Sequence, residues 1–114
     1  MNPQSVWIME LSNARSFREQ GFEGKARVCA RRAVGFAIAS YHSRNGRNVA
    51  SPNAINLMNQ MLEENLLPAG VATSLVILLQ RVNAAGELDG SPDLIECAQI
   101  VIDHLFPGAN YGSA

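Results

Sequence analysis

The residues best suited to chemistry lie close together, in the stretch KARVCARRAVGFAIASYHSR at positions 25–44. Arg27, Arg31 and Arg32 occur within six residues of one another. His42 follows ten residues after the last of them, and the stretch contains no acidic residue. A guanidinium group stays protonated at neutral pH and donates several hydrogen bonds, so grouped arginines are typical of phosphate-binding proteins. These four residues form the candidate site for an anion, a nucleotide or RNA.

A structural interpretation of the same stretch competes with the chemical one. At 100° per residue on a helix, its small and apolar side chains fall on one broad face. That face consists of Ala26, Cys29, Ala30, Ala33, Val34, Ala37 and Tyr41. Arg27, Arg31 and His42 fall on one flank of it. Lys25 and Arg32 fall on the other flank, so the cations border a packing surface and do not form one continuous stripe.

Flanking arginines of this kind cover the edge of a core with their aliphatic stems and pair their charged heads with acids. The acidic partners that the sequence offers are Glu63, Glu64, Asp93 and Glu96. Residues 1–47 hold eight basic and three acidic residues, a net charge of +5. Residues 48–114 hold one basic and seven acidic residues, a net charge of −6. The structural interpretation is favoured, and an anion site is the alternative.

No other group of residues specifies a reaction or a metal. The residues that come nearest to a metal-binding set are Asp89, Asp93, Glu96, Asp103 and His104. Adjacent side chains on a helix diverge by 100°, and the sequence lacks the Glu-x-x-His pairs of di-metal bundles. Helix capping and surface charge explain this set. The sequence therefore predicts no catalytic residue, no metal and no cofactor.

Cys29 and Cys97 are the only cysteines in 114 residues, and both lie in apolar stretches. Burial raises the pKa of a thiol and keeps it unreactive, so we expect neither a nucleophile nor a disulfide framework. A hydrophobic fraction of 47% supports one core. The N-terminus shows no signal peptide, and the longest apolar run, VATSLVILL, is shorter than the ~20 residues of a membrane span. We expect a single cytoplasmic domain with no membrane partner.

Helix start and stop signals divide the chain into five helices. We expect them at about 5–19, 23–44, 51–65, 68–82 and 91–105. Ser51-Pro52 and Ser91-Pro92 each supply an N-cap serine followed by a proline at the first helical position. No alternating strand pattern occurs. The sequence predicts an all-α, single-domain up-and-down bundle at 1–107 and a flexible tail at 108–114.

The order of these elements resembles HEPN-like domains, which are small nucleotide-binding helical bundles. The resemblance rests on ARVCARRAVGFAI in the second helix, the turn SRNGRN, the segment LLQRVNAAGELDG and the last helix LIECAQIVIDHL. It implies a bundle that binds nucleotides, binds a partner or dimerises. The implied protein partner is a nucleotidyltransferase-like chain or the other member of a toxin–antitoxin-like pair.

Catalytic HEPN-like domains cut RNA with an arginine that is followed, after four to six residues, by a histidine. His42 would need an arginine at 35–37, where glycine, phenylalanine and alanine stand. His104 would need one at 97–99, where cysteine, alanine and glutamine stand. The sequence therefore favours a non-catalytic interaction module, expected as a homodimer. RNA or nucleotide binding by the second helix is the alternative, and an activity formed only with a partner chain stays open.

Overall fold

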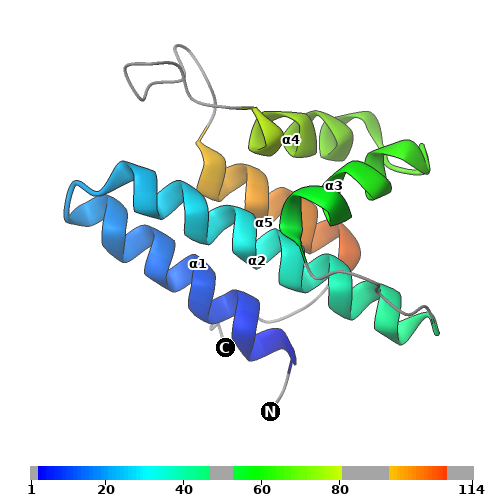
Figure 1. Cartoon of the computed structure of the whole chain (residues 1–114), viewed down its shortest axis with the longest axis horizontal. Helices are drawn as coiled ribbons and strands as arrows, with labels where there is room; N and C mark the ends of the chain where they lie inside the picture. The colour runs from blue at the N-terminus through cyan, green and yellow to red at the C-terminus, as the bar shows by residue number, and fades with distance from the viewer. Residues whose placement is uncertain (1–2, 47–52, 81–92, 108–114) are drawn as a thin grey trace.

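The computed structural model describes residues 3–46, 53–80 and 93–107. In these ranges the chain forms five helices and no strand, which confirms the predicted all-α bundle (Figure 1). The helices are α1 (Pro3–Glu19), α2 (Glu23–Arg44), α3 (Ala54–Glu63), α4 (Ala69–Leu79) and α5 (Leu94–Leu105). The predicted tail at 108–114 lies outside the described residues.

The longest helix, α2, is the centre of the bundle. α1 turns back along it, and Gly21 adopts a positive φ of 87° between the two helices, a conformation open to glycine at little energetic cost. α5 lies behind α2 in the view of Figure 1, and α3 packs on the C-terminal half of α2. α4 packs mainly on α5 and also touches α3. α2 therefore meets a neighbour on most of its circumference.

The burial of α2 follows the predicted packing face and extends beyond it. Six of the seven predicted side chains are buried, and Tyr41 is half-buried. Gly35, Ile38 and His42 are buried as well, because α3 covers a side of α2 that the pattern of alanines does not mark. The contact is close: a Cβ atom built on Gly35 would lie 2.6 Å from the Cβ atom of Ala54 at the start of α3.

The N-caps of α3 and α5 differ from the predicted serines. Asn53 caps α3 by accepting a hydrogen bond from the backbone N–H of Asn56 at 3.1 Å. Asp93 caps α5 by accepting from Ile95 N at 2.8 Å. In both places the sequence reads Ser-Pro followed by Asn or Asp, and these residues cap helices as well as serine does. The helices consequently begin two to three residues later than expected, at Ala54 and Leu94.

α4 ends at Leu79, three residues before the expected end at Val82. Gln80 has an extended backbone with φ −65° and ψ 138°, so the helical hydrogen-bond pattern stops there. None of the five helices in the described ranges combines the length and apolarity needed to cross a membrane.

Candidate functional site

Arg31 lies against the C-terminal end of α4. Its Nε donates a hydrogen bond to the carbonyl oxygen of Leu78 at 2.6 Å, and its Nη2 donates to that of Gln80 at 2.9 Å. The last carbonyls of a helix lack hydrogen-bond partners within the helix and carry a partial negative charge. A cationic donor there supplies the missing hydrogen bonds and balances the charge. Burial, and secondarily the nearby charge of Arg27, lowers the pKa of Arg31. The guanidinium of Arg31 is thus engaged within the bundle.

Replacing Arg31 with methionine is expected to lower the free energy of unfolding by about 1–2 kcal/mol, because two charge-assisted hydrogen bonds disappear. Methionine keeps most of the aliphatic stem, so the loss reports the head group. Urea unfolding followed by circular dichroism measures it.

Arg15→Met is the matched control for this variant, since the exposed Arg15 donates one hydrogen bond to the Gln99 side chain at 3.1 Å. We expect a change within about 0.5 kcal/mol for the control. Equal losses for the two variants would contradict a capping role of Arg31.

Arg32 pairs with an acid on α1. Its Nε lies 2.9 Å from Oε2 of Glu10. The Arg32 side chain is 58% exposed, whereas that of Glu10 is only 10% exposed. A buried carboxylate without a partner would be strongly unfavourable, so Arg32 neutralises Glu10 and joins α1 to α2. Glu10 was absent from the acids expected to pair with these arginines.

The two cysteines behave as the sequence predicts. Both are free and buried. Burial raises the pKa of the Cys29 thiol, and the negative charge of Glu10 adds to the effect. Burial also raises the pKa of Cys97. Protonated thiols are poor nucleophiles, so neither side chain is equipped for covalent catalysis in this environment.

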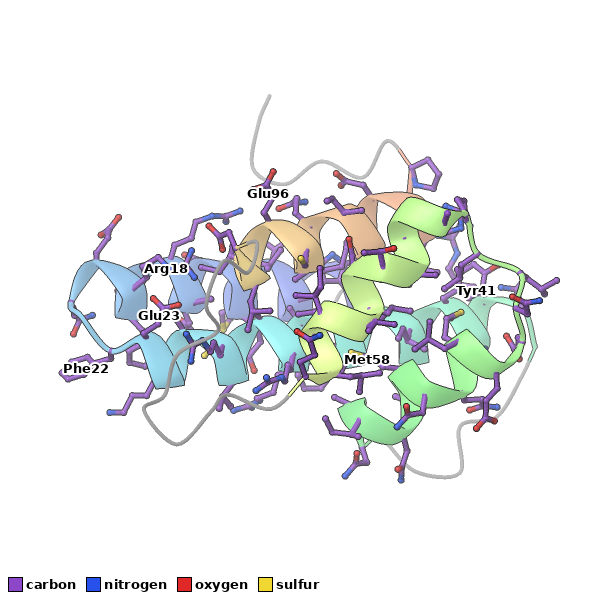
Figure 2. The ribbon with its side chains drawn as sticks, turned by 90° about the horizontal axis from the view of Figure 1, so that it is seen from above. Arg18, Phe22, Glu23, Tyr41, Met58 and Glu96 are labelled. Carbon is purple, nitrogen blue, oxygen red and sulfur yellow. The ribbon has the colours of Figure 1, made fainter. Side chains whose placement is uncertain are left out.

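Arg18 holds three helices together, although sequence reasoning did not select it. It donates to Glu23 through Nε at 3.0 Å and through Nη2 at 2.7 Å. It also pairs with Asp93, the N-cap of α5. Figure 2 shows Arg18 and Glu23 directed toward each other at the junction of α1 and α2.

The pKa values around Arg18 follow from these contacts. Hydrogen bonds to Glu23 and then to Asp93 raise the pKa of Arg18. The bond from Arg18 is the main cause of the lowered pKa of Glu23. Burial acts to raise the pKa of Asp93, but hydrogen bonds from Arg18 and from Ile95 N outweigh it and leave this pKa lowered. Both carboxylates are therefore ionised and engaged at neutral pH.

Arg27 lies near an acid that was not among its expected partners, and two of the expected acids lie elsewhere. Arg27 Nε lies 3.9 Å from Oε2 of Glu23, one helical turn away. Asp93, an expected partner of Arg27 or Arg31, instead pairs with Arg18. Glu96, another expected partner, is exposed and points away from the bundle (Figure 2).

His42 lies apart from the arginines. It is eleven residues beyond Arg31 on α2, a rise of about 16 Å along the helix axis. Its side chain is buried, and neither ring nitrogen has a hydrogen-bond partner among the described residues. It packs edge-on against Tyr41, with ring centroids 6.1 Å apart. The four predicted site residues are therefore not brought together: Arg31 and Arg32 have internal partners, and His42 lies in the core.

The described part of the chain holds no group of three or more metal-binding side chains. Asp93 serves as a helix cap, and Asp103 accepts a hydrogen bond from the Gln99 side chain at 3.2 Å. Asp89 lies outside the described residues. This arrangement fits the interpretation of these acids as caps and surface charges.

α2 also carries a row of exposed side chains. Val28, Arg32 and Phe36 are spaced four residues apart and form an exposed stripe along the flank of the alanine-rich face on which Arg32 was predicted. Met9 on α1 and Ile55 on α3 are also exposed; Met9 directly precedes Glu10, the partner of Arg32, and Ile55 directly follows Ala54, which lies against Gly35. The four apolar side chains among these five residues are 37–59% exposed. We call the exposed stripe of Val28, Arg32 and Phe36 the α2 outer face.

This face could have been found in the sequence, because the i, i+4, i+8 spacing of Val28, Arg32 and Phe36 sets them apart from the alanines. The chain matches no protein-family model, no curated protein and no solved structure. The resemblance to HEPN-like domains therefore stays a prediction.

Proposed function

We propose that this chain is a non-catalytic, HEPN-like helical module that works by binding another protein, in the first place a second copy of itself. The observation that carries the proposal is the α2 outer face, where large apolar side chains remain exposed on the central helix. Scattered exposed apolar residues are normal, but a group around one helix marks an interaction surface. Two of its residue types support this, since Phe and Arg are enriched at protein interfaces.

The state of the arginines favours this function over RNA or nucleotide binding. Arg31 already donates to two carbonyl oxygens, and Arg32 already pairs with Glu10. A phosphate group would have to compete with these internal partners. The sequence pI of about 6.1 also lies well below the value above ~9 that is typical of nucleic-acid-binding domains.

The HEPN-like resemblance suggests further partners, a nucleotidyltransferase-like chain or the other member of a toxin–antitoxin-like pair. We place the module in the cytoplasm, as the sequence composition predicts. The outer face would serve a second copy and a different protein by the same means, the burial of apolar surface.

Sedimentation equilibrium tests the proposal at protein concentrations of about 1–100 µM, which span micromolar dissociation constants. We expect a mass twice that of the 12.3 kDa chain. Raising the salt concentration should leave this mass nearly unchanged, because apolar burial drives the association. A monomer over the whole range would contradict the proposal. Salt-sensitive binding of single-stranded RNA would instead favour the nucleotide-binding alternative.

A further inference from the structure

We infer that α3 is held on α2 by a pH-sensitive contact, and that protonation of His42 at mildly acidic pH releases α3 from the bundle. The release goes beyond the proposed function and does not depend on self-association. Three features support it: the place of His42 on the side of α2 that α3 covers, the unbonded state of its ring, and the attachment of α3 mainly to α2.

His42 lies in the row of α2 residues that faces α3. It follows Gly35 by seven residues, close to two full helical turns, so the two residues point in nearly the same direction. Gly35 packs against Ala54, the first residue of α3. His42 is only 3% exposed. The packing of α3 on this side of α2 therefore contributes to the burial of the His42 ring.

The ring of His42 is buried without a hydrogen bond. A neutral imidazole offers one donor and one acceptor, and neither ring nitrogen has a partner among the described residues. The protonated imidazole carries a full charge and two donors, and an unpaired buried charge costs much more free energy than a neutral polar group. Protonation of His42 therefore favours any state of the chain in which this ring reaches water.

No acid in the described part of the chain forms a hydrogen bond with His42. The guanidinium of Arg44, two residues further along α2, lies over the ring of Phe106. Helix carbonyls at a C-terminus attract cations, but three of those in the last turn of α2 already accept hydrogen bonds from the backbone N–H groups that follow. α4 has no ionisable side chain. The other ionisable groups on the surrounding elements are Glu10 on α1, which pairs with Arg32, Glu63 on α3, Glu64 directly after α3, and Asp103 and His104 on α5.

α3 can leave α2 without separating the other helices. It packs on α2 and, less extensively, on α4, whereas α1 and α5 remain joined to α2, and α4 remains joined to α5. Figure 1 shows α3 beside the C-terminal half of α2, on the same side of the bundle as α4. The buried side chains of α3 are Leu57, Met58 and Met61. Release of α3 brings these apolar side chains into contact with water, so a partner could bind them at acidic pH.

Hydrogen exchange of the α3 amides tests the inference. An imidazole in water takes up its proton at about pH 6.5, so one proton bound on opening raises the equilibrium constant for opening roughly eightfold from about pH 7 to about pH 5.5. After correction for intrinsic exchange rates, the protection of α3 should fall by this factor. At both pH values the best-protected α3 amides should be less protected than those of α1, because α3 opens while the rest stays folded.

His42→Leu should remove this pH dependence, because leucine is apolar and takes up no proton. His104→Leu is the matched control, since His104 is the only other histidine of the chain and is exposed on α5. This control should keep the fall seen in the wild type. The lowered pKa values of Glu23 and Asp93 keep both carboxylates ionised over the same interval. Circular dichroism checks that each variant folds, and His42→Gln, which does not titrate, should behave as His42→Leu does.

Two results would overturn the inference. An equal fall in α3 protection in the wild type, His42→Leu and His42→Gln would remove His42 as its cause. Equal protection of α3 and α1 amides in the wild type would show that α3 leaves α2 only when the whole bundle unfolds. Neither result bears on the proposed function, which the mass measured by sedimentation decides separately.

Discussion

Replacement of Trp7 by alanine is expected to lower the free energy of unfolding by about 3–5 kcal/mol. The side chain has no exposed surface and stacks on Phe106, with ring centroids 4.7 Å apart and an interplanar angle of 30°. Phe106 directly follows α5 and also meets Tyr41 of α2 edge-on at 6.4 Å. Trp7 therefore ties α1 to the far end of α5 and, through Phe106, to α2. Its removal leaves a large cavity where three helices join.

Trp7→Phe is the matched control for this prediction. Phenylalanine keeps an aromatic ring against Phe106 and removes Nε1, which has no hydrogen-bond partner among the described residues. We expect a loss of about 1–2 kcal/mol, well below that of alanine. Urea unfolding at one fixed protein concentration measures both variants, because dimerisation would make stability concentration-dependent. Losses of equal size in the two variants would contradict the stacking of Trp7 on Phe106.

A loss of this size would leave little stability in reserve. Domains of this length are stable by about 5–15 kcal/mol, so the alanine variant approaches the margin for folding. Partial unfolding should then begin at the end of the bundle formed by Trp7, Tyr41 and Phe106. Hydrogen exchange of α1 amides, compared with that of α4 amides, would show the difference. Uniform acceleration in all helices would indicate global unfolding instead.

The helices themselves were predictable because each has local signals. The second helix was placed at Glu23–Arg44, and the structure gives the same bounds. Its alanine-rich face also packs as the 3.6-residue period requires. The N-caps were displaced because Ser-Pro and the following Asn53 or Asp93 compete for the same position, and the sequence alone does not decide between them.

The hydrogen-bond and ion-pair partners of the arginines were less predictable, because they lie far away along the chain. Arg31 bonds carbonyl oxygens 47 and 49 residues later, and backbone groups leave no trace in a sequence. Arg18 forms an ion pair with Asp93, which was expected to pair with other arginines. Burial of His42 depends on how α3 crosses α2, which a helical pattern does not specify. The sequence indicated that the arginines of the second helix border the core, but their partners could be identified only from the fold.

The crossing of α2 and α3 depends on the missing side chain of Gly35. Replacing Gly35 with alanine is expected to destabilise the protein by about 1–3 kcal/mol. The added Cβ would lie 2.6 Å from Cβ and 3.0 Å from Cα of Ala54, so the start of α3 must move. Alanine favours a helix interior over glycine by about 0.5–1 kcal/mol, so a net loss shows that the clash outweighs the helix propensity.

Gly24→Ala is the matched control, since it also lies in α2 and a Cβ there would meet no atom within 4 Å. It should be neutral or slightly stabilising, and thermal unfolding monitored by circular dichroism compares the two. The double variant Gly35→Ala/Ala54→Gly moves the methyl group from α3 to α2 and removes the Cβ–Cβ clash. We expect it to recover part of the loss, with a coupling free energy of about 0.5–3 kcal/mol. Additive effects of the two substitutions would contradict direct contact between Gly35 and Ala54, and with it this placement of α3 on the central helix.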